Sequence, residues 1–298
     1  LGAQASDIKI IGGEIVAPHS ESYILSLQRV HSHFCGATLV SATNGICASH
    51  CVYPAETVDA VAGAHNIDQN EPEQQRNRLT KFMKHPNYRP LIIANDISVI
   101  GFTDVMVLSD AIKPAQLPPS QSAEWMPNGA EVRVCGWGNI AYPGTDYPSQ
   151  LYCTDTHIVD NDTCNGAAHY NGGILPGMFC AGELNVGGKD ACQGTVQNNN
   201  FSHGKKQLFT LKTIVENFGQ ESKIFSSENL IKSLNIDQKA TTFSIEFEFE
   251  GDSGGPVIYN GMVVGATSWG QGCALPRYPG VYTDVAMFVD WVMTEIQL

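Results

Sequence analysis

A glycine-rich turn near the C-terminal end holds the residue best suited to nucleophilic chemistry. Ser253 lies within Gly251-Asp252-Ser253-Gly254-Gly255-Pro256. Neighbouring glycines let a substrate carbonyl approach closely because they carry no Cβ. Their N–H groups can also stabilise a developing oxyanion. A serine in such a turn is by itself only a turn residue, so its interpretation as a nucleophile depends on a base and a carboxylate elsewhere.

Two other segments offer that base and that carboxylate. His50 lies among small residues in Ala48-Ser49-His50-Cys51, and imidazole titrates near neutrality. Asp96 opens an apolar run in Asn95-Asp96-Ile97-Ser98. Taken alone, the histidine has a structural reading and the aspartate can cap or turn the chain. As a set with Ser253, they predict a carboxylate that orients an imidazole, which in turn activates a hydroxyl.

The elements that must position these residues read as β-strands with one helix. Short apolar runs at Tyr23–Leu27, Ala37–Val40 and Val58–Val61 are broken by turn residues, which indicates an antiparallel sandwich or barrel. Near the C-terminus, apolar residues recur at three- and four-residue intervals from Val285 to Ile296. This period predicts a helix from Asp284 to about Ile296 with one buried face.

Composition describes a folded globular protein. The 298 residues are 43% hydrophobic and 16% charged, enough for one large unit or two small ones. The net charge of −13 argues against nucleic acid as a partner. No run of about 18 apolar residues occurs, so no membrane span is predicted. Nine cysteines without a Cys-x-x-Cys pair favour disulfides in a secreted setting over a zinc site, and the odd number leaves one thiol over.

The N-terminal residues carry two processing signals. Ala3-Gln4-Ala5 has the form of a signal-peptidase site, so residues 1–5 are either the stub of a signal peptide or an ordinary disordered terminus. Cleavage after Lys9 would create an α-amino group on Ile10, and such a cation is buried only against an anion. Asp252 is the candidate anion. The alternative is an exposed flexible linker at residues 9–13.

These motifs together resemble the trypsin-like members of the chymotrypsin-fold family of serine peptidases. The resemblance covers nearly the whole chain and keeps the family order of histidine, aspartate and serine. It implies an all-β fold with two packed six-stranded antiparallel Greek-key barrels, the active site between them, and a C-terminal α-helix. We expect a signal stub and activation peptide at 1–9, an N-terminal barrel at 10–117 and a C-terminal barrel at 118–298. The matching stretches are Ile10–Gly13, Cys35–Val40, Ala48–Cys51, Val61–Ile67, Asn95–Ile100, Cys135–Gly138, Met178–Gly182, Gly251–Pro256, Ser268–Gly272 and Pro279–Tyr282.

The resemblance also assigns roles to individual residues. It makes Ser253 the nucleophile, His50 the general base and then acid, and Asp96 the orienting carboxylate. The N–H groups of Gly251 and Ser253 would form the oxyanion hole, with Gly194 replacing Gly251 if the intervening segment is absent. A carboxylate at the base of the primary pocket favours a Lys or Arg side chain of the substrate. The expected substrate-binding residues are Asp190, Ser268, Gly270 and Gly280, and the expected activation residues are Lys9, Ile10 and Asp252.

The family pattern predicts three disulfides and leaves three cysteines to be explained. The predicted pairs are Cys35–Cys51, Cys164–Cys180 and Cys192–Cys273. Tyr259 occupies the usual partner position of Cys135, so Cys153 is a hypothetical partner. Cys47 replaces a small hydroxyl residue and is predicted to be a buried free thiol. We interpret the residual histidines, such as His31, His33 and His157, as loop or surface residues.

One loop raises the question of whether the protein binds a metal ion. The stretch from Ala64 to Glu73 resembles a calcium loop, but Ala64 stands where relatives place a carboxylate. Because Ca²⁺ needs six to eight oxygen ligands, no metal is predicted, and no cofactor is needed for the expected chemistry.

Residues 195–250 interrupt the family pattern between Gly194 and Asp252. They hold seven of the 12 phenylalanines and six of the lysines, and no Cys, Pro, Trp, Tyr or Arg. Our leading hypothesis is an unspliced, in-frame intron, because phenylalanine, lysine, asparagine and isoleucine have A/T-rich codons. The second hypothesis is a genuine loop insertion with short helices at 208–218 and 228–234 and a strand at 241–249.

The sequence therefore predicts a secreted zymogen of a monomeric serine endopeptidase that cleaves after Lys or Arg through an acyl-enzyme. Its expected partners are polypeptide substrates and protein protease inhibitors, with no nucleic acid and no membrane. The alternatives are a non-catalytic homologue that acts as a binding protein and an inactive product of an unspliced transcript.

Overall fold

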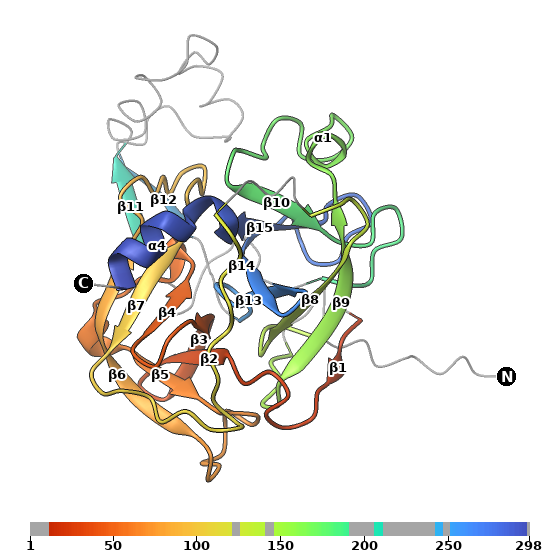
Figure 1. Cartoon of the computed structure of the whole chain (residues 1–298). Helices are drawn as coiled ribbons and strands as arrows, with labels where there is room; N and C mark the ends of the chain where they lie inside the picture. The colour runs from red at the N-terminus through yellow and green to blue at the C-terminus, as the bar shows by residue number, and fades with distance from the viewer. Residues whose placement is uncertain are drawn as a thin grey trace, which may run out of the picture. The chain divides into compact units, whose positions relative to one another are not determined.

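The computed structural model describes residues 12–120, 126–140, 146–190, 206–210, 242–246 and 251–296. The chain divides into a main unit, Leu1–Gly194 with Phe249–Leu298, and a second unit, Thr195–Glu248. The described part of the main unit consists mostly of β-strands (Figure 1). None of its helices has the length and apolar character that crossing a membrane requires.

The first barrel is a closed sheet of six strands in the order β2-β3-β4-β7-β6-β5, all antiparallel. In β2, Leu25 and Leu27 point into the barrel core while Ile24 joins a different cluster, as the two-residue period of a strand requires. The strands are β2 (Ile24–Arg29), β3 (Ser32–Leu39), β4 (Asn44–Cys47), β5 (Asp59–Ala62), β6 (Gln75–Lys84) and β7 (Ser98–Phe102).

The second barrel also closes with six antiparallel strands. Its sheet runs β9-β10-β15-β14-β13-β8, and pairing of β8 with β9 completes the ring. A seventh strand, β1 (Glu14–Ile15), pairs with β9 on the outside. The prediction of two six-stranded barrels is confirmed. The strands are β8 (Glu131–Gly136), β9 (Tyr152–Val159), β10 (Met178–Ala181), β13 (Pro256–Tyr259), β14 (Met262–Trp269) and β15 (Gly280–Asp284).

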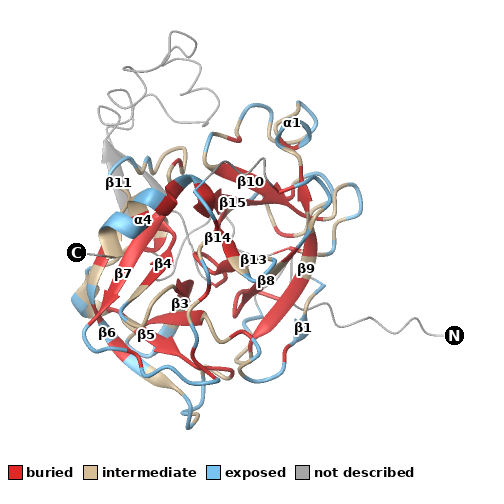
Figure 2. Ribbon diagram, viewed as in Figure 1, coloured by how far each residue is buried: buried red, intermediate tan, exposed pale blue. Residues whose placement is uncertain are grey.

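The C-terminal helix links the two barrels. A 3₁₀ turn, η4 (Val285–Phe288), leads into α4 (Val289–Ile296), so the predicted span is confirmed and its first turn is tighter than an α-helix. The Asp284 carboxylate caps the start by accepting the Ala286 N–H at 3.1 Å. The buried face packs on Ile46, Ile97 and Val99 of the first barrel, and its outer face is exposed (Figure 2).

Three further short helical elements lie in the described part of the main unit. They are η1 (Ser49–Cys51), which carries His50, η2 (Ala55–Thr57) and α1 (Asn161–Cys164). The Asp160 side chain caps α1 by accepting the Thr163 N–H.

Disulfides cross-link segments of the main unit. The predicted pairs Cys35–Cys51 and Cys164–Cys180 are present. Cys135 pairs with Cys153, as hypothesised, because the two residues face each other across β8 and β9 with Cα atoms 4.1 Å apart. Cys273 is disulfide-bonded, and its predicted partner Cys192 lies outside the described residues. Cys47 is a buried free thiol, as predicted.

The second unit contributes one described hairpin, β11 (Lys206–Thr210) with β12 (Thr242–Glu246). The predicted strand at 241–249 is confirmed over β12. The predicted helix at 208–218 is wrong over residues 208–210, which lie in β11, where Phe209 pairs with Phe243. Phenylalanine and threonine favour a paired strand, and this pairing outweighs the weak helical period. The rest of that prediction and the helix at 228–234 lie outside the described residues.

Candidate active site

The serine turn lies directly before β13 and is attached to both barrels. The Gly36 N–H of the first barrel donates to the Ser253 carbonyl at 2.8 Å, and the Gly254 N–H donates to the Thr267 carbonyl at 2.8 Å. Gly254 has a φ of 75°, and a Cβ there would lie 2.4 Å from the Cys47 sulfur. The turn therefore requires glycine at this position both for its backbone conformation and for space.

The imidazole of His50 and the carboxylate of Asp96 form a close pair. His50 Nδ1 lies 2.7 Å from Asp96 Oδ2, and the His50 backbone N–H donates to Asp96 Oδ1 at 2.9 Å. Only 1% of either side chain is exposed. An ionised carboxylate can only accept, so Nδ1 carries the proton and Nε2 keeps its lone pair. This is the tautomer that a general base needs.

A second-barrel residue completes the surroundings of Asp96. The Ser268 hydroxyl of β14 donates to Asp96 Oδ2 at 2.5 Å. The sequence assigned Ser268 only to substrate binding through its backbone, so this contact was missed. Ser268 and His50 come from different barrels, and their shared acceptor holds the imidazole in register with the serine turn.

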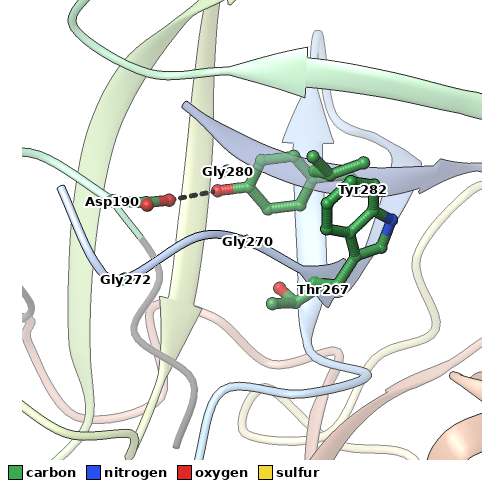
Figure 3. A pocket seen from close by; sticks show the side chains of 8 residues that line it. Asp190, Thr267, Gly270, Gly272, Gly280 and Tyr282 are labelled. Atoms are coloured by element: carbon green, nitrogen blue, oxygen red, sulfur yellow. Dashed lines mark hydrogen bonds between the residues drawn. The ribbon is translucent and has the colours of Figure 1, made fainter. Parts of the chain in front are cut away.

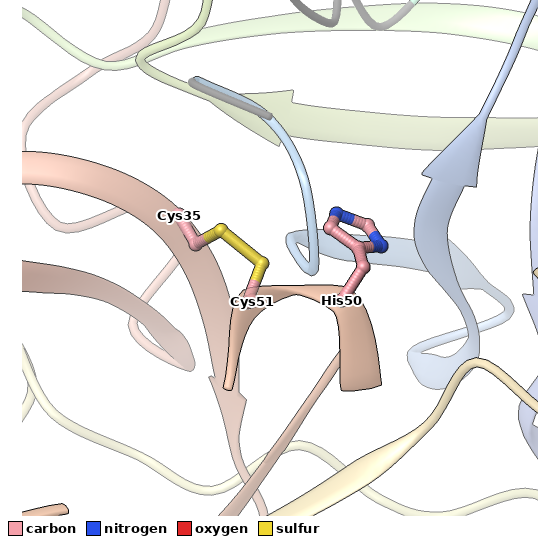
Figure 4. A group of neighbouring side chains, drawn as sticks. All are labelled: Cys35, His50 and Cys51. Atoms are coloured by element: carbon pink, nitrogen blue, oxygen red, sulfur yellow. A yellow bond between two sulfur atoms is a disulfide. The ribbon is translucent and has the colours of Figure 1, made fainter. Parts of the chain in front are cut away.

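The Ser253 hydroxyl oxygen is buried and has no hydrogen-bond partner among the described residues. The Cys51 sulfur, next to His50, contacts the Ser253 carbonyl at 3.6 Å. Figure 4 shows His50 on η1 beside the Cys35–Cys51 disulfide. Catalytic hydrogen bonds often close only when substrate is bound, so the arrangement is compatible with activation of Ser253 by His50.

Gly251 is held by the first barrel at both of its backbone polar groups. Its N–H donates to the Phe34 carbonyl at 3.4 Å, and its carbonyl lies 3.1 Å from His33 Nε2. In this conformation the N–H expected in the oxyanion hole is directed at Phe34. It would have to leave that carbonyl to reach a substrate oxyanion. Gly194, the other expected donor, lies outside the described residues.

His33 is a half-buried residue of strand β3, and its interpretation as a loop or surface residue is wrong. Burial lowers its pKa to about 4, so the ring is neutral at pH 7. A carbonyl only accepts, so Nε2 donates to Gly251. Nδ1 then accepts the Ser26 hydroxyl at 2.8 Å. A hydroxyl at a buried position of an apolar strand was the sequence signal, because it needs a partner.

The other two histidines agree with their prediction. His31 lies in the exposed β2–β3 turn. His157 is 42% exposed and pairs with Glu183 at 2.8 Å.

A pocket with a carboxylate at its base opens in the second barrel (Figure 3). Asp190 is 2% exposed. Its Oδ1 accepts the Tyr282 hydroxyl at 3.0 Å, and its Oδ2 accepts the Ala274 N–H at 3.1 Å. Two fixed donors favour the charged form of a buried carboxyl. The pocket is lined by Asp190, Thr267, Trp269, Gly270, Gly272, Gly280, Val281 and Tyr282.

Two glycines of this pocket keep side chains out of it. A Cβ on Gly280 would lie 2.4 Å from Asp190 Oδ1, so any side chain there would collide with the carboxylate. A Cβ on Gly270 would meet nothing nearer than 3.5 Å, which places it at the open wall. The structure thus brings together Asp190, Gly270 and Gly280 as expected.

Asp252 lies fully buried behind the serine, and the Gly138 N–H donates to its Oδ1 at 2.8 Å. This is where an activated N-terminus was expected to bind. The other two activation residues, Lys9 and Ile10, lie outside the described residues.

An amide group organises the loop that resembles a calcium site. The Gln74 Nε2 atom lies 3.2 Å from the Asn66 carbonyl, 3.0 Å from the Gln69 carbonyl and 3.2 Å from Glu71 Oε2. Glu71 also accepts the N–H groups of His65 and Asn66. The Gln74 amide therefore gives the oxygens of this loop a neutral donor from the chain itself.

Comparison with known proteins identifies the family. The model of the trypsin family matches residues 10–195 and 206–292. Trypsin of Xenopus laevis is 32% identical over 99% of this chain and 95% of its own length. The anionic trypsin of Canis lupus familiaris is 33% identical, over 97% and 90%. Trypsin of Sus scrofa is 31% identical, over 97% and 96%. The chain belongs to the trypsin family and is a trypsin-like serine endopeptidase by fold and by relatives.

Proposed function

We propose that this chain is the secreted zymogen of an endopeptidase that cleaves peptide bonds after Lys or Arg. Ser253, His50 and Asp96 act as nucleophile, base and orienting carboxylate. His50 Nε2 accepts the Ser253 proton as the oxygen attacks the scissile carbonyl. It then returns that proton to the departing amine, leaving an acyl-enzyme that water hydrolyses by the same steps.

The observation that carries the Lys/Arg preference is the buried Asp190 carboxylate at the end of a glycine-walled pocket. A substrate cation adds a charge-assisted hydrogen bond to this carboxylate, while an apolar side chain offers it no donor. The sequence Ser268–Gly270 offers backbone groups for the strand-like substrate segment before the cleaved bond.

Activation follows from the same charge logic. Cleavage after Lys9 places an ammonium on Ile10, and we propose that it pairs with the buried Asp252. That pairing would draw the serine turn into shape and release the Gly251 N–H from the Phe34 carbonyl. Three disulfides among the described residues support a secreted setting, and we expect a monomer whose partners are polypeptide substrates and protein inhibitors.

The test is hydrolysis of matched arginyl, lysyl and phenylalanyl esters by the chain before and after cleavage at Lys9. We expect cleavage at Lys9 to switch on hydrolysis of the two cationic esters, and Ser253→Ala to abolish it. Labelling by a fluorophosphonate should follow the same pattern.

The non-catalytic homologue is favoured by one observation, the engagement of the Gly251 N–H by Phe34. If the cleaved chain neither hydrolyses the esters nor reacts with the fluorophosphonate, that alternative replaces our proposal. The unspliced-transcript hypothesis is tested separately, by sequencing the transcript across residues 194–251. Sequencing reads that include the insert would refute the unspliced-transcript hypothesis.

A further inference from the structure

Arg29, near the active site, is a cation that has no anion partner among the described residues. It is the last residue of β2, and its guanidinium lies 4.0 Å above the ring of Tyr53. Its Nε atom is buried. Within the described part of the chain, this atom has no hydrogen-bond partner and Arg29 makes no ion pair. A buried N–H without an acceptor is costly, so an acceptor that reaches this guanidinium would relieve that cost.

Other arginines of the molecule show the contrast. Arg76 and Arg78 both pair with Asp59, and Arg133 pairs with Glu21 and Asp155. The chain has 30 acidic and 17 basic residues, so carboxylates are abundant. Arg29 differs from these three arginines because it has no carboxylate partner among the described residues.

A short series of contacts connects Arg29 to the serine turn. Tyr53, under the guanidinium, packs edge-on against Phe34 at 5.2 Å between ring centroids. The Phe34 carbonyl in turn contacts the Gly251 N–H. Phe34 also precedes Cys35, whose disulfide to Cys51 lies beside the His50 imidazole (Figure 4). Arg29 thus lies on the first-barrel side of Ser253.

The primary pocket lies on the other side, because all of its lining residues belong to the second barrel or to the loops next to it. If the residue before the cleaved bond enters that pocket, the chain must cross Ser253. The residues after the cleaved bond then run over the first barrel, past Phe34 and Tyr53. On this path the leaving part of the substrate would pass Arg29.

We propose that Arg29 binds a carboxylate in the first two residues after the cleaved bond, so that the enzyme prefers Asp or Glu there. This rests on the proposed function and adds a second charge criterion to it: a cation before the bond and an anion after it. Stacking on Tyr53 holds the guanidinium plane in place, and its N–H fork matches a carboxylate in two-point geometry. A side-chain carboxylate and the C-terminal carboxylate of a short leaving peptide share this chemistry, and we assign the side chain.

The experiment uses quenched fluorescent peptides with one Arg and an amidated C-terminus, which differ only in having Glu or Gln at the first or second position after it. We expect wild-type kcat/KM to be about tenfold higher for Glu at one of these positions, as for one charge-assisted hydrogen bond. Arg29→Gln should bring the ratio to about one. A matched set with free C-termini separates the two sources of carboxylate, because our assignment requires the preference to persist in the amidated set.

Arg277→Gln is the matched control. Arg277 also lies over a tyrosine, Tyr278, but donates to the Ala168 carbonyl in the second barrel. Its removal should leave the ratio of Glu to Gln unchanged.

An arginyl amide with no residue after the cleaved bond separates the inference from the function on which it rests. Arg29→Gln should cleave this amide like the wild type, which also reports correct folding. No cleavage of the amide by the wild type would remove the proposed function. Cleavage of the amide together with equal rates on the Glu and Gln peptides would overturn the role of Arg29 alone, as would a preference that survives in Arg29→Gln.

Discussion

The two barrels present opposite kinds of surface to the same serine. The first barrel offers groups with fixed internal partners: Asp96 holds His50, and Ser26 holds His33. The second barrel offers a pocket that is lined by the buried carboxylate of Asp190. Both aspartates are almost completely buried, yet one is arranged for proton transfer and the other for recognition. Residue type and burial therefore do not define a role. The two carboxylates differ in what they face, which is an imidazole for Asp96 and the pocket for Asp190.

The largest effect should come from the first-barrel carboxylate. Asp96→Asn keeps the shape but presents an amide to His50 Nδ1, which favours the wrong tautomer. We expect kcat to fall about 10⁴-fold, equally for arginyl and lysyl esters, in steady-state assays of the cleaved chain. Asp155→Asn, which breaks a half-exposed ion pair with Arg133, is the control and should leave the rates unchanged. Unequal losses on the two esters would contradict the assignment of Asp96 to proton transfer alone.

The second-barrel carboxylate should instead control selectivity. Asp190→Asn removes the counter-charge for the substrate cation, so kcat/KM for arginyl and lysyl esters should fall about 100- to 1,000-fold. The phenylalanyl ester should lose much less, and labelling of Ser253 by a small fluorophosphonate should persist. Loss of labelling would mean that Asp190 supports the serine turn itself, which contradicts a purely recognitive role.

His33 tests whether the first barrel supports the second-barrel turn through Gly251. Its pKa of about 4 is below the ordinary value of about 6.5, so the unfolded chain takes up the proton first as pH falls. The neutral ring should stabilise the fold fully above pH ~6.5. That stability should be lost between pH ~6.5 and 4, by an amount on the order of 3 kcal/mol.

Urea unfolding between pH 7 and 4 measures this loss. His33→Gln should have a shallower decline of unfolding free energy than the wild type. His31→Asn, an exposed residue of the same hairpin, should keep the wild-type slope. Parallel slopes for wild type and His33→Gln would show that His33 does not titrate in this way.

The smallest effect is expected in the hairpin that carries these histidines. Val30 and His31 join β2 to β3 with φ values of 50° and 65°, a two-residue turn that favours Asn and Gly over a β-branched residue. Val30 is 92% exposed, so Val30→Asn loses almost no packing and should stabilise the protein by about 1 kcal/mol.

Thermal or urea unfolding should report this gain with no change in kcat. Val107→Asn, exposed but without a positive φ, should give no comparable gain. An equal gain from both variants would point to exposed apolar surface, and not to backbone strain, as the cause.

Much of this architecture could be predicted because it depends on local sequence. The two-residue alternation of β2 and the three- and four-residue spacing from Val285 to Ile296 each describe one buried face. The Cys135–Cys153 pair could be suggested only because the usual partner position holds Tyr259, and the register of β8 on β9 made it possible. The helix expected from Leu208 failed over its first residues, because cross-strand pairing with Phe243 lies outside any local window.

The candidate site divides in the same way. The sequence by itself determined which residues are able to do the chemistry, since Ser253, His50, Asp96 and Asp190 are identified by type, neighbours and order. Only the tertiary structure decided that Ser268 shares Asp96 with His50, that His33 is neutral next to Gly251, and that the Gly251 N–H turns toward Phe34. It also decided that Arg29 has no anion among the described residues. The physical reason is that a hydrogen bond or an ion pair depends on distance and direction between groups far apart in the chain, and these are fixed when the two barrels close and pack.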